Sequence, residues 1–145
     1  MTQRFAVPRV SAFLCSLMFV FLLPASSYSQ PFPVPKDTLC AECGMMVNPD
    51  SKFSAEVITT DGKKLFFCDI GDMLRHFRSD RGKLKTAYVK DYTSGAWIDG
   101  EKAYYVLDKR LSTPMSWSIA AFREEPEARK WGKPVDFKGA FGLLK

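Results

Sequence analysis

The stretch that decides the fold lies at residues 53–77 and reads F-S-A-E-V-I-T-T-D-G-K-K-L-F-F-C-D-I-G-D-M-L-R-H-F. Its first half holds two short runs, at residues 53–59 and 64–67, that are rich in β-branched and aromatic side chains. Asp61-Gly62 lies between them, and this pair favours the tight turns that join antiparallel strands. We therefore expect a β-hairpin here.

The second half of the stretch has the spacing of a helix. Its apolar residues recur on one helical face, and the set is Ile70, Met73, Leu74 and Phe77. Such a face packs against the core. Asp69 directly precedes it, and its carboxylate can accept from the N–H of Asp72 or of a neighbouring residue. Residues 86–92 then have the composition of a strand, which completes a ββαβ unit.

The C-terminal part of the chain is predicted to repeat this order of elements. Strands are expected at residues 103–107 and 117–122, with a longer loop between them. A short helix should follow, with Pro126 near its start and Gly132 after its end, and residues 135–137 should close the unit. The sequence therefore predicts an α+β protein of two small related ββαβ units, at residues 40–94 and 95–145.

The N-terminal segment, residues 1–29, has the layout of a secretory signal peptide. Arg4 and Arg9 precede an apolar stretch that is shorter than a membrane span, and small residues follow it. Cleavage is expected after Ser29 or after Ser27, with an uncleaved N-terminus that anchors the protein to a membrane as the alternative. Residues 30–39 contain three prolines and are predicted to form an extended linker.

The charge of the chain gives little information about partners. The sequence has 21 basic and 16 acidic residues, and loss of Arg4 and Arg9 with the signal leaves a formal charge of +3. The two signs are interleaved, so nucleic-acid binding is not expected. Removal of the signal also removes Cys15 and leaves three cysteines, so at least one thiol must be free, modified, metal-bound or paired between molecules.

Four sulfur side chains lie within residues 40–46, which read C-A-E-C-G-M-M. Thiolate and thioether ligands together select Cu(I). Cys40 and Cys43 can face one point if the chain turns between them, and Gly44 permits a reversal that returns Met45 toward that point. Met46 is an additional candidate ligand whose other role would be packing in the core. The segment is therefore a candidate site for a soft metal ion.

Other residues with metal-binding chemistry have two interpretations each. Met115 lies in a loop, where its side chain either packs beneath the loop or is a ligand brought against the cysteines. Cys68 is either a ligand or a small buried side chain. His76 lies off the apolar helical face and is predicted to be solvated surface. Asp69 and Asp72 are interpreted as acids that cap the helix or lie in its first turn.

Together these segments resemble the NosL family of copper-binding accessory proteins of bacterial nitrous oxide reductase. The matching pieces are C-A-E-C-G-M-M-V from Cys40, F-C-D-I-G-D-M-L from Phe67, A-Y-Y-V from Ala103, and T-P-M followed by A-A-F through Phe122. The resemblance implies a periplasmic Cu(I) metallochaperone, not an enzyme, with a fold similar to the core of alkylmercury lyase. Many members are lipoproteins, whereas Cys15 is not placed for lipid attachment.

The resemblance also implies ligands and partners. Cys43, Met45 and Met115 would be the preferred ligands of one Cu(I) per chain, with Cys40 as an alternate or second thiolate. The copper would serve the centres of nitrous oxide reductase, or of another cuproenzyme, in cooperation with an ABC-type membrane maturation complex. Nothing in the chain itself identifies this client.

Two other functions fit parts of the sequence. A thiol–disulfide oxidoreductase would use Cys40 and Cys43, but no thioredoxin-like βαβ pattern surrounds the pair and it does not begin a clear helix. A structural zinc site would use the three mature cysteines and His76, but these ligands lack the second paired spacing of a zinc knuckle. A Cu(I) carrier remains the leading hypothesis.

Overall fold

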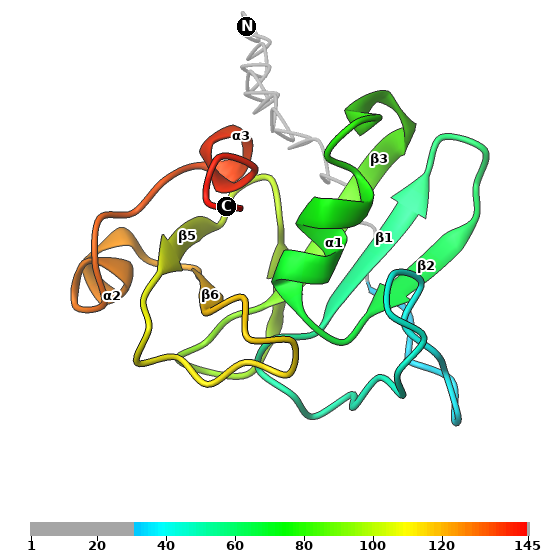
Figure 1. The fold of residues 1–145 in the computed structure, drawn as a ribbon, viewed down its shortest axis with the longest axis horizontal. Coiled ribbons are helices and arrows are strands. Elements are labelled where there is room, and N and C mark those ends of the chain that lie inside the picture. The colour runs from blue at the N-terminus through cyan, green and yellow to red at the C-terminus, as the bar shows by residue number, and fades with distance from the viewer. Residues whose placement is uncertain (1–30, 145) are drawn as a thin grey trace, which may run out of the picture.

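The computed structural model describes residues 31–144, so the predicted signal peptide and its cleavage site lie outside the described residues. A four-stranded antiparallel sheet of order β2-β1-β3-β4 and a two-stranded sheet of β5 and β6 form two neighbouring halves (Figure 1). The elements are β1 (Ala55–Thr59), β2 (Lys64–Phe67), α1 (Ile70–His76), the 3₁₀ turn η1 (Arg81–Lys83), β3 (Leu84–Lys90), β4 (Trp97–Asp99), β5 (Tyr104–Leu107), β6 (Ile119–Phe122), α2 (Glu125–Arg129) and α3 (Phe137–Ala140). None of the helices at residues 31–144 is long and apolar enough to cross a bilayer.

The first ββαβ unit forms as predicted. β1 and β2 pair antiparallel from Ala55 opposite Phe67 to Ile58 opposite Lys64, and the turn between them has Gly62 at φ +82°. The Asp69 carboxylate caps α1 by accepting from the N–H of Gly71 at 2.9 Å. The predicted apolar face of α1 is fully buried or nearly so, and the set is Ile70, Met73, Leu74 and Phe77. This confirms that Met73 belongs to the core.

The second half differs from the expectation in two places. Residues 97–99, assigned above to the second unit and not predicted as a strand, form β4 and pair with β3 in the first sheet. The prediction of a strand at residues 135–137 is wrong, because Val135 makes only a single β-bridge, to Tyr105. The chain turns instead into α3, since the Asp136 carboxylate accepts from the N–H of Gly139 at 2.7 Å and so caps a helix.

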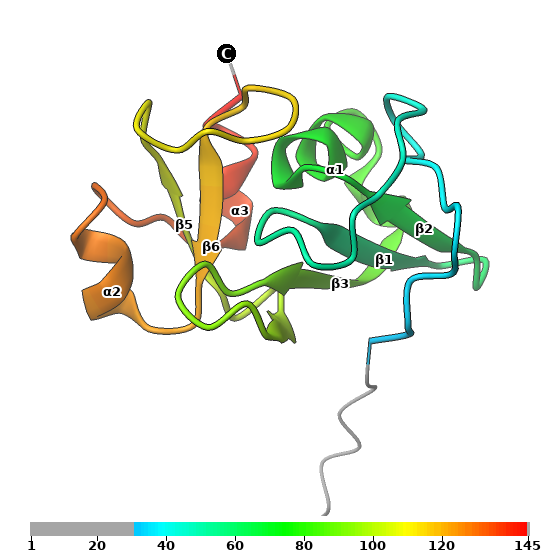
Figure 2. The same cartoon turned by 90° about the horizontal axis from the view of Figure 1, so that it is seen from below.

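The two halves share one main core. Figure 2 shows α2 and α3 on opposite sides of the β5–β6 pair. Tyr105, Ile119 and Ala121 point toward the main core with α1 and α3, while Val106, Ala120 and Phe122 point toward α2 in a smaller cluster. Because β6 also contacts α1, the loop between β5 and β6 lies near the start of α1. This arrangement brings residues of the second half to the cysteines of the first.

The predicted linker runs against the first sheet. Residues 31–38 form no helix or strand, and Leu39 makes a single bridge to Met46. The N–H of Phe32 donates to both carboxylate oxygens of Glu56 at 3.1 Å. Glu56 is fully buried, and burial raises its pKa. The segment therefore covers a carboxylate that would otherwise lie on an open sheet face.

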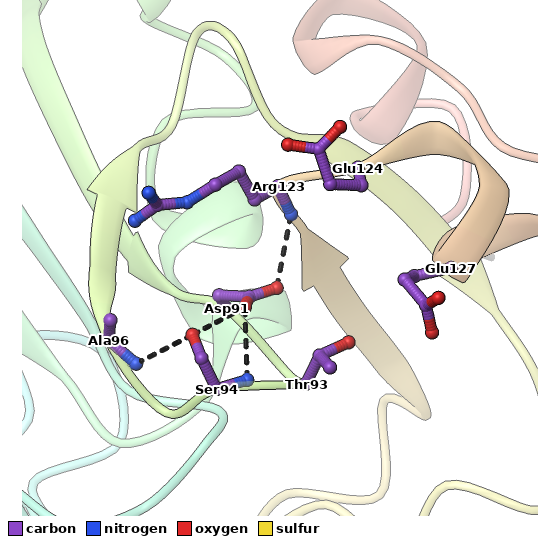
Figure 3. A pocket seen from close by; sticks show the side chains of 7 residues that line it. All are labelled: Asp91, Thr93, Ser94, Ala96, Arg123, Glu124 and Glu127. Atoms are coloured by element: carbon purple, nitrogen blue, oxygen red, sulfur yellow. Dashed lines mark hydrogen bonds between the residues drawn. The ribbon is translucent and has the colours of Figure 1, made fainter.

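Asp91 joins the two sheets where β3 ends. It bridges to Ala121 of β6, and its carboxylate accepts from the backbone N–H of Arg123 and from the hydroxyl and N–H of Ser94 (Figure 3). These residues line a pocket of about 330 Å³ at the junction. Burial alone would raise the pKa of Asp91, but the hydrogen bonds outweigh it and hold the pKa below its usual value.

Asp91→Asn is expected to lower the free energy of unfolding by about 1–2 kcal/mol at neutral pH, because charge-assisted hydrogen bonds are replaced by neutral ones. A carboxyl whose pKa is lowered by folding stabilises the fold above its unfolded pKa, and that stability is lost as the pH falls through its folded pKa. The free energies of unfolding of the parent and of Asp91→Asn should therefore approach each other in acid. Urea unfolding at pH 7 and pH 3 measures this. Asp50→Asn, at an exposed position, should show no such pattern.

Candidate metal centre

The cysteine segment folds into a tight turn that lies against the first unit. The N–H of Gly44 donates to the Cys40 carbonyl at 3.0 Å, and the N–H of Cys40 donates to the Met45 carbonyl at 2.7 Å. Gly44 has φ +75°, so the predicted reversal at this glycine is confirmed. The N–H of Ala41 donates to the Phe66 carbonyl at 2.9 Å, which holds the turn beside the end of β2.

A second attachment holds the same turn on α1. The carboxylate of Glu42 contacts Arg75 at 3.1 Å and Nδ1 of His76 at 3.0 Å. The His76 ring also packs on Phe67 and Phe77. His76 is exposed, as predicted, but its ring nitrogen already has a partner in the turn between the cysteines.

Three thiols and one carboxylate converge at this place. Sγ of Cys43 lies 3.4 Å from Sγ of Cys68, and the thiols of Cys40 and Cys68 donate to Oδ2 of Asp72 at 3.4 and 3.6 Å. The four ligand atoms lie within 4.8 Å of one another. Cys40 and Cys68 are buried, whereas Cys43 is partly exposed. The group therefore has a polar and sulfur-rich interior with one accessible thiol.

Asp72 was not predicted to take part in this group. The sequence suggested only an acid in the first turn of a helix, and the fourth group near the sulfurs is Asp72, where the alternative zinc hypothesis would have used His76. Spacing along the chain gave no signal for this, because Cys68 precedes the extended N-cap Asp69 and the helical four-residue periodicity does not apply to it. Only the position of the preceding turn brings Cys40 and Cys43 to Cys68 and Asp72.

Two acids connect this group to the loop that carries Met115. Oδ1 of Asp72 accepts from Nε1 of Trp117 at 2.8 Å, and Oδ2 of Asp69 accepts from the N–H of Met115 at 2.9 Å. Burial raises the pKa of Asp69, although the hydrogen bonds that it accepts oppose this. Met115 is partly buried against the main core. The structure thus places the Met115 loop directly on the N-terminal end of α1.

The two methionines that follow Cys43 lie on the surface. Met45 is 52% exposed and Met46 is 67% exposed, and Leu39 beside them is exposed as well. The predicted packing role of Met46 is therefore wrong, because its bridge to Leu39 turns it away from the core. Met45 contributes a backbone hydrogen bond to the Cys43 sulfur. Its half-exposed side chain belongs to the same turn as Cys43.

The surroundings of Cys43 and Cys68 favour the protonated form of these two thiols when no metal is bound. Burial raises the pKa of Cys43, and burial together with the neighbouring thiols raises the pKa of Cys68. Metal binding needs thiolates, so an incoming ion must displace these protons. Binding of a metal ion at this group should accordingly strengthen as the pH rises.

Comparisons with known proteins agree with one another. A family model described as NosL matches residues 31–138. The copper-binding lipoprotein NosL of Stutzerimonas stutzeri is 30% identical over 100 residues, which cover 62% of this chain and 52% of that protein, so the chain spans about half the length of this relative. The crystal structure of the copper chaperone NosL from Shewanella denitrificans matches with a TM-score of 0.66 at 21% identity, over 75% of this chain and 93% of that one, and supports the fold.

Proposed function

Because this chain belongs to the NosL family, we propose that it is an exported, periplasmic Cu(I) metallochaperone that binds one Cu(I) per chain and is not an enzyme. It delivers copper for the centres of nitrous oxide reductase or of a related cuproenzyme. The observation that carries this proposal is the convergence of three thiol sulfurs and one carboxylate within 4.8 Å. The names of the two relatives, a copper-binding lipoprotein and a copper chaperone, support it.

The donor set suits Cu(I) because it is dominated by soft sulfur. Thiolates from Cys40 and Cys43 would supply charge, and the thioethers of Met45 and Met115 would add weaker bonds. Cys68 lies close enough to Cys43 to serve as a further thiolate. A site that combines strong and weak sulfur ligands holds copper against water and still releases it to a partner.

Release of copper requires a route between the site and a partner. Cys43 is the accessible thiol of the group, and the exposed apolar side chains of Leu39, Met45 and Met46 lie around the same turn. A partner that covers this turn can exchange ligands with Cys43 without exposing copper to solvent. The partners proposed are the reductase and its ABC-type membrane maturation complex, with an uncleaved N-terminus as a further means of membrane association.

Anaerobic titration with a chromophoric Cu(I) chelator tests the binding function. The reduced protein should retain one Cu(I) per chain in competition with the chelator. The delivery function is tested in cells that lack this protein, where nitrous oxide reductase should accumulate without its full copper content. A reduced protein that yields all its Cu(I) to the chelator would exclude the proposal.

Met115→Leu is expected to weaken Cu(I) binding about tenfold, or ~1.4 kcal/mol, because one thioether bond is lost while the apolar volume is kept. The same chelator competition measures the change. Met46→Leu serves as the matched control, since its side chain is 67% exposed and should leave the affinity unchanged. Equal affinities in the parent and in Met115→Leu would remove Met115 from the ligand set.

Zinc is the second candidate cargo, and Asp72 is the observation that favours it. Three cysteines and one carboxylate match the four-coordinate sites that zinc prefers. Metal analysis of protein purified without added metal separates the two, because a zinc protein would carry close to one zinc per chain. The oxidoreductase hypothesis is less well supported, since burial raises the pKa of Cys43 and a reactive thiol needs a lowered one.

A further inference from the structure

Two of the three thiols in the metal centre contact each other through their sulfur atoms. Sγ of Cys43 and Sγ of Cys68 lie 3.4 Å apart and are not bonded. Cys40 directs its thiol to Asp72 instead, at 3.4 Å. The pair expected from the sequence spacing was Cys40 with Cys43, whereas the sulfur contact of 3.4 Å joins Cys43 to Cys68, which lies between β2 and the cap of α1.

The backbone holds this pair in a position from which a bond can form. A disulfide has an S–S length of about 2.05 Å, so the two sulfurs need to approach by roughly 1.4 Å. Cys68 is fixed between the last residue of β2 and the cap of α1. Cys43 lies in the turn that is tied to Phe66 by a backbone hydrogen bond and is partly exposed. A small movement of this turn is enough.

We propose that Cys43 and Cys68 form a reversible disulfide in the copper-free protein. The oxidant is a disulfide R–S–S–R, either a protein disulfide or glutathione disulfide. The Cys43 thiolate attacks one sulfur of R–S–S–R, the S–S bond breaks, and R–S⁻ leaves and takes up the proton lost by Cys43. The Cys68 thiolate then attacks Cys43 in the mixed disulfide and displaces the second R–S⁻, which takes up the proton of Cys68. Two protein thiols are oxidised and one R–S–S–R is reduced to two R–SH.

This bond would control copper loading, a consequence that rests on the proposed Cu(I) function. The disulfide removes two of the three thiols that face the site and leaves Cys40. Copper and the disulfide therefore exclude each other. Oxidation also protects the accessible Cys43 from irreversible conversion to sulfinic and sulfonic acids.

The reaction should be slow, which separates it from catalysis of disulfide exchange. Cys68 is buried and Cys43 is only partly exposed, so a disulfide oxidant has limited access to the pair. Uncatalysed thiol–disulfide rearrangement takes minutes to hours. The proposed pair is thus a modification site on a carrier and does not require turnover with a protein substrate.

The test uses metal-free protein isolated from the compartment to which it is exported and treated for hours with glutathione disulfide. Alkylation of free thiols followed by peptide mass mapping should find Cys43 linked to Cys68 and Cys40 alkylated. Cys40→Ser should keep the link, whereas Cys68→Ser and Cys68→Ala should not form an intramolecular disulfide. Two substitutions at Cys68 guard against a variant that fails to fold.

The outcomes separate the two proposals. The thiol mapping is done without copper, so its result does not depend on whether the protein binds Cu(I). Absence of an intramolecular disulfide in the parent, its loss in Cys40→Ser, or its persistence in the Cys68 variants would each overturn the assignment. In the supporting case the oxidised parent should hold less than about a tenth of the Cu(I) held by the reduced parent, and dithiothreitol should restore binding.

Discussion

Cys43→Ser should weaken Cu(I) binding by at least about a hundredfold, equivalent to ~2.7 kcal/mol or more. The reason is that a soft thiolate is replaced by a hydroxyl, which is a poor ligand for Cu(I) and keeps its proton at neutral pH. Cys43 is the accessible thiol of the group and lies 3.4 Å from Cys68. Under the proposed function, its loss would remove both a ligand and the position from which copper would pass to a partner.

Chelator competition under anaerobic conditions measures this effect, and urea unfolding of the metal-free protein provides the control. Because Cys43 is partly exposed, the free energy of unfolding should change little. Met46→Ala should retain the affinity of the parent, since its side chain lies on the surface beside the same turn. A Cys43→Ser protein that holds Cu(I) as tightly as the parent would show that the site lies elsewhere.

Gly71→Ala is expected to reduce the free energy of unfolding by about 3 kcal/mol and to disturb the metal centre as well. A Cβ at Gly71 would lie 2.0 Å from Cγ of Trp117 and 2.3 Å from its Cβ. Neither atom belongs to a flexible chain end, so Trp117 and its backbone would have to move. This movement would break the hydrogen bond that Nε1 of Trp117 donates to Asp72, and it would shift the Met115 loop away from α1.

The sign of this effect opposes the one that helix propensity predicts. Alanine is more favourable than glycine by about 1 kcal/mol inside a helix, so propensity alone would make Gly71→Ala stabilising. Gly82→Ala is the matched control, because a Cβ there meets only Oδ1 of Asp80, at 3.8 Å. Urea unfolding of both variants measures whether each substitution lowers or raises the free energy of unfolding. A Gly71→Ala protein as stable as the parent would mean that Trp117 is not held against the helix as the structure shows.

The two predictions concern different links between the halves of the molecule. Cys43→Ser tests the thiol group itself. Gly71→Ala tests the close contact between Gly71 and Trp117 that lets the β5–β6 loop reach α1. Asp69 and Asp72 connect these features, since one accepts from the backbone of Met115 and the other from both Trp117 and the thiols. Copper binding and the packing of the second half on the first are therefore expected to be coupled.

Local patterns predicted the first unit well. The hairpin at Asp61-Gly62, the cap at Asp69 and the buried face with Met73 depend on residues close together in the chain, and all were confirmed. The prediction for residues 135–137 failed because a single cap, the Asp136 carboxylate, favours a helix over a third strand. The pairing of β4 with β3 was missed because so short a strand carries no clear periodicity.

The sequence by itself determined the kind of chemistry, because thiols and thioethers at residues 40–46 and the glycine that turns them are a local property of the chain. Only the tertiary structure decided which groups share the site. Cys68 and Asp72 join Cys40 and Cys43 because contacts of Ala41 and Glu42 hold the turn against β2 and α1, and Met45 and Met46 are exposed on that turn. Such contacts depend on how distant segments pack, and no spacing along the chain contains that information.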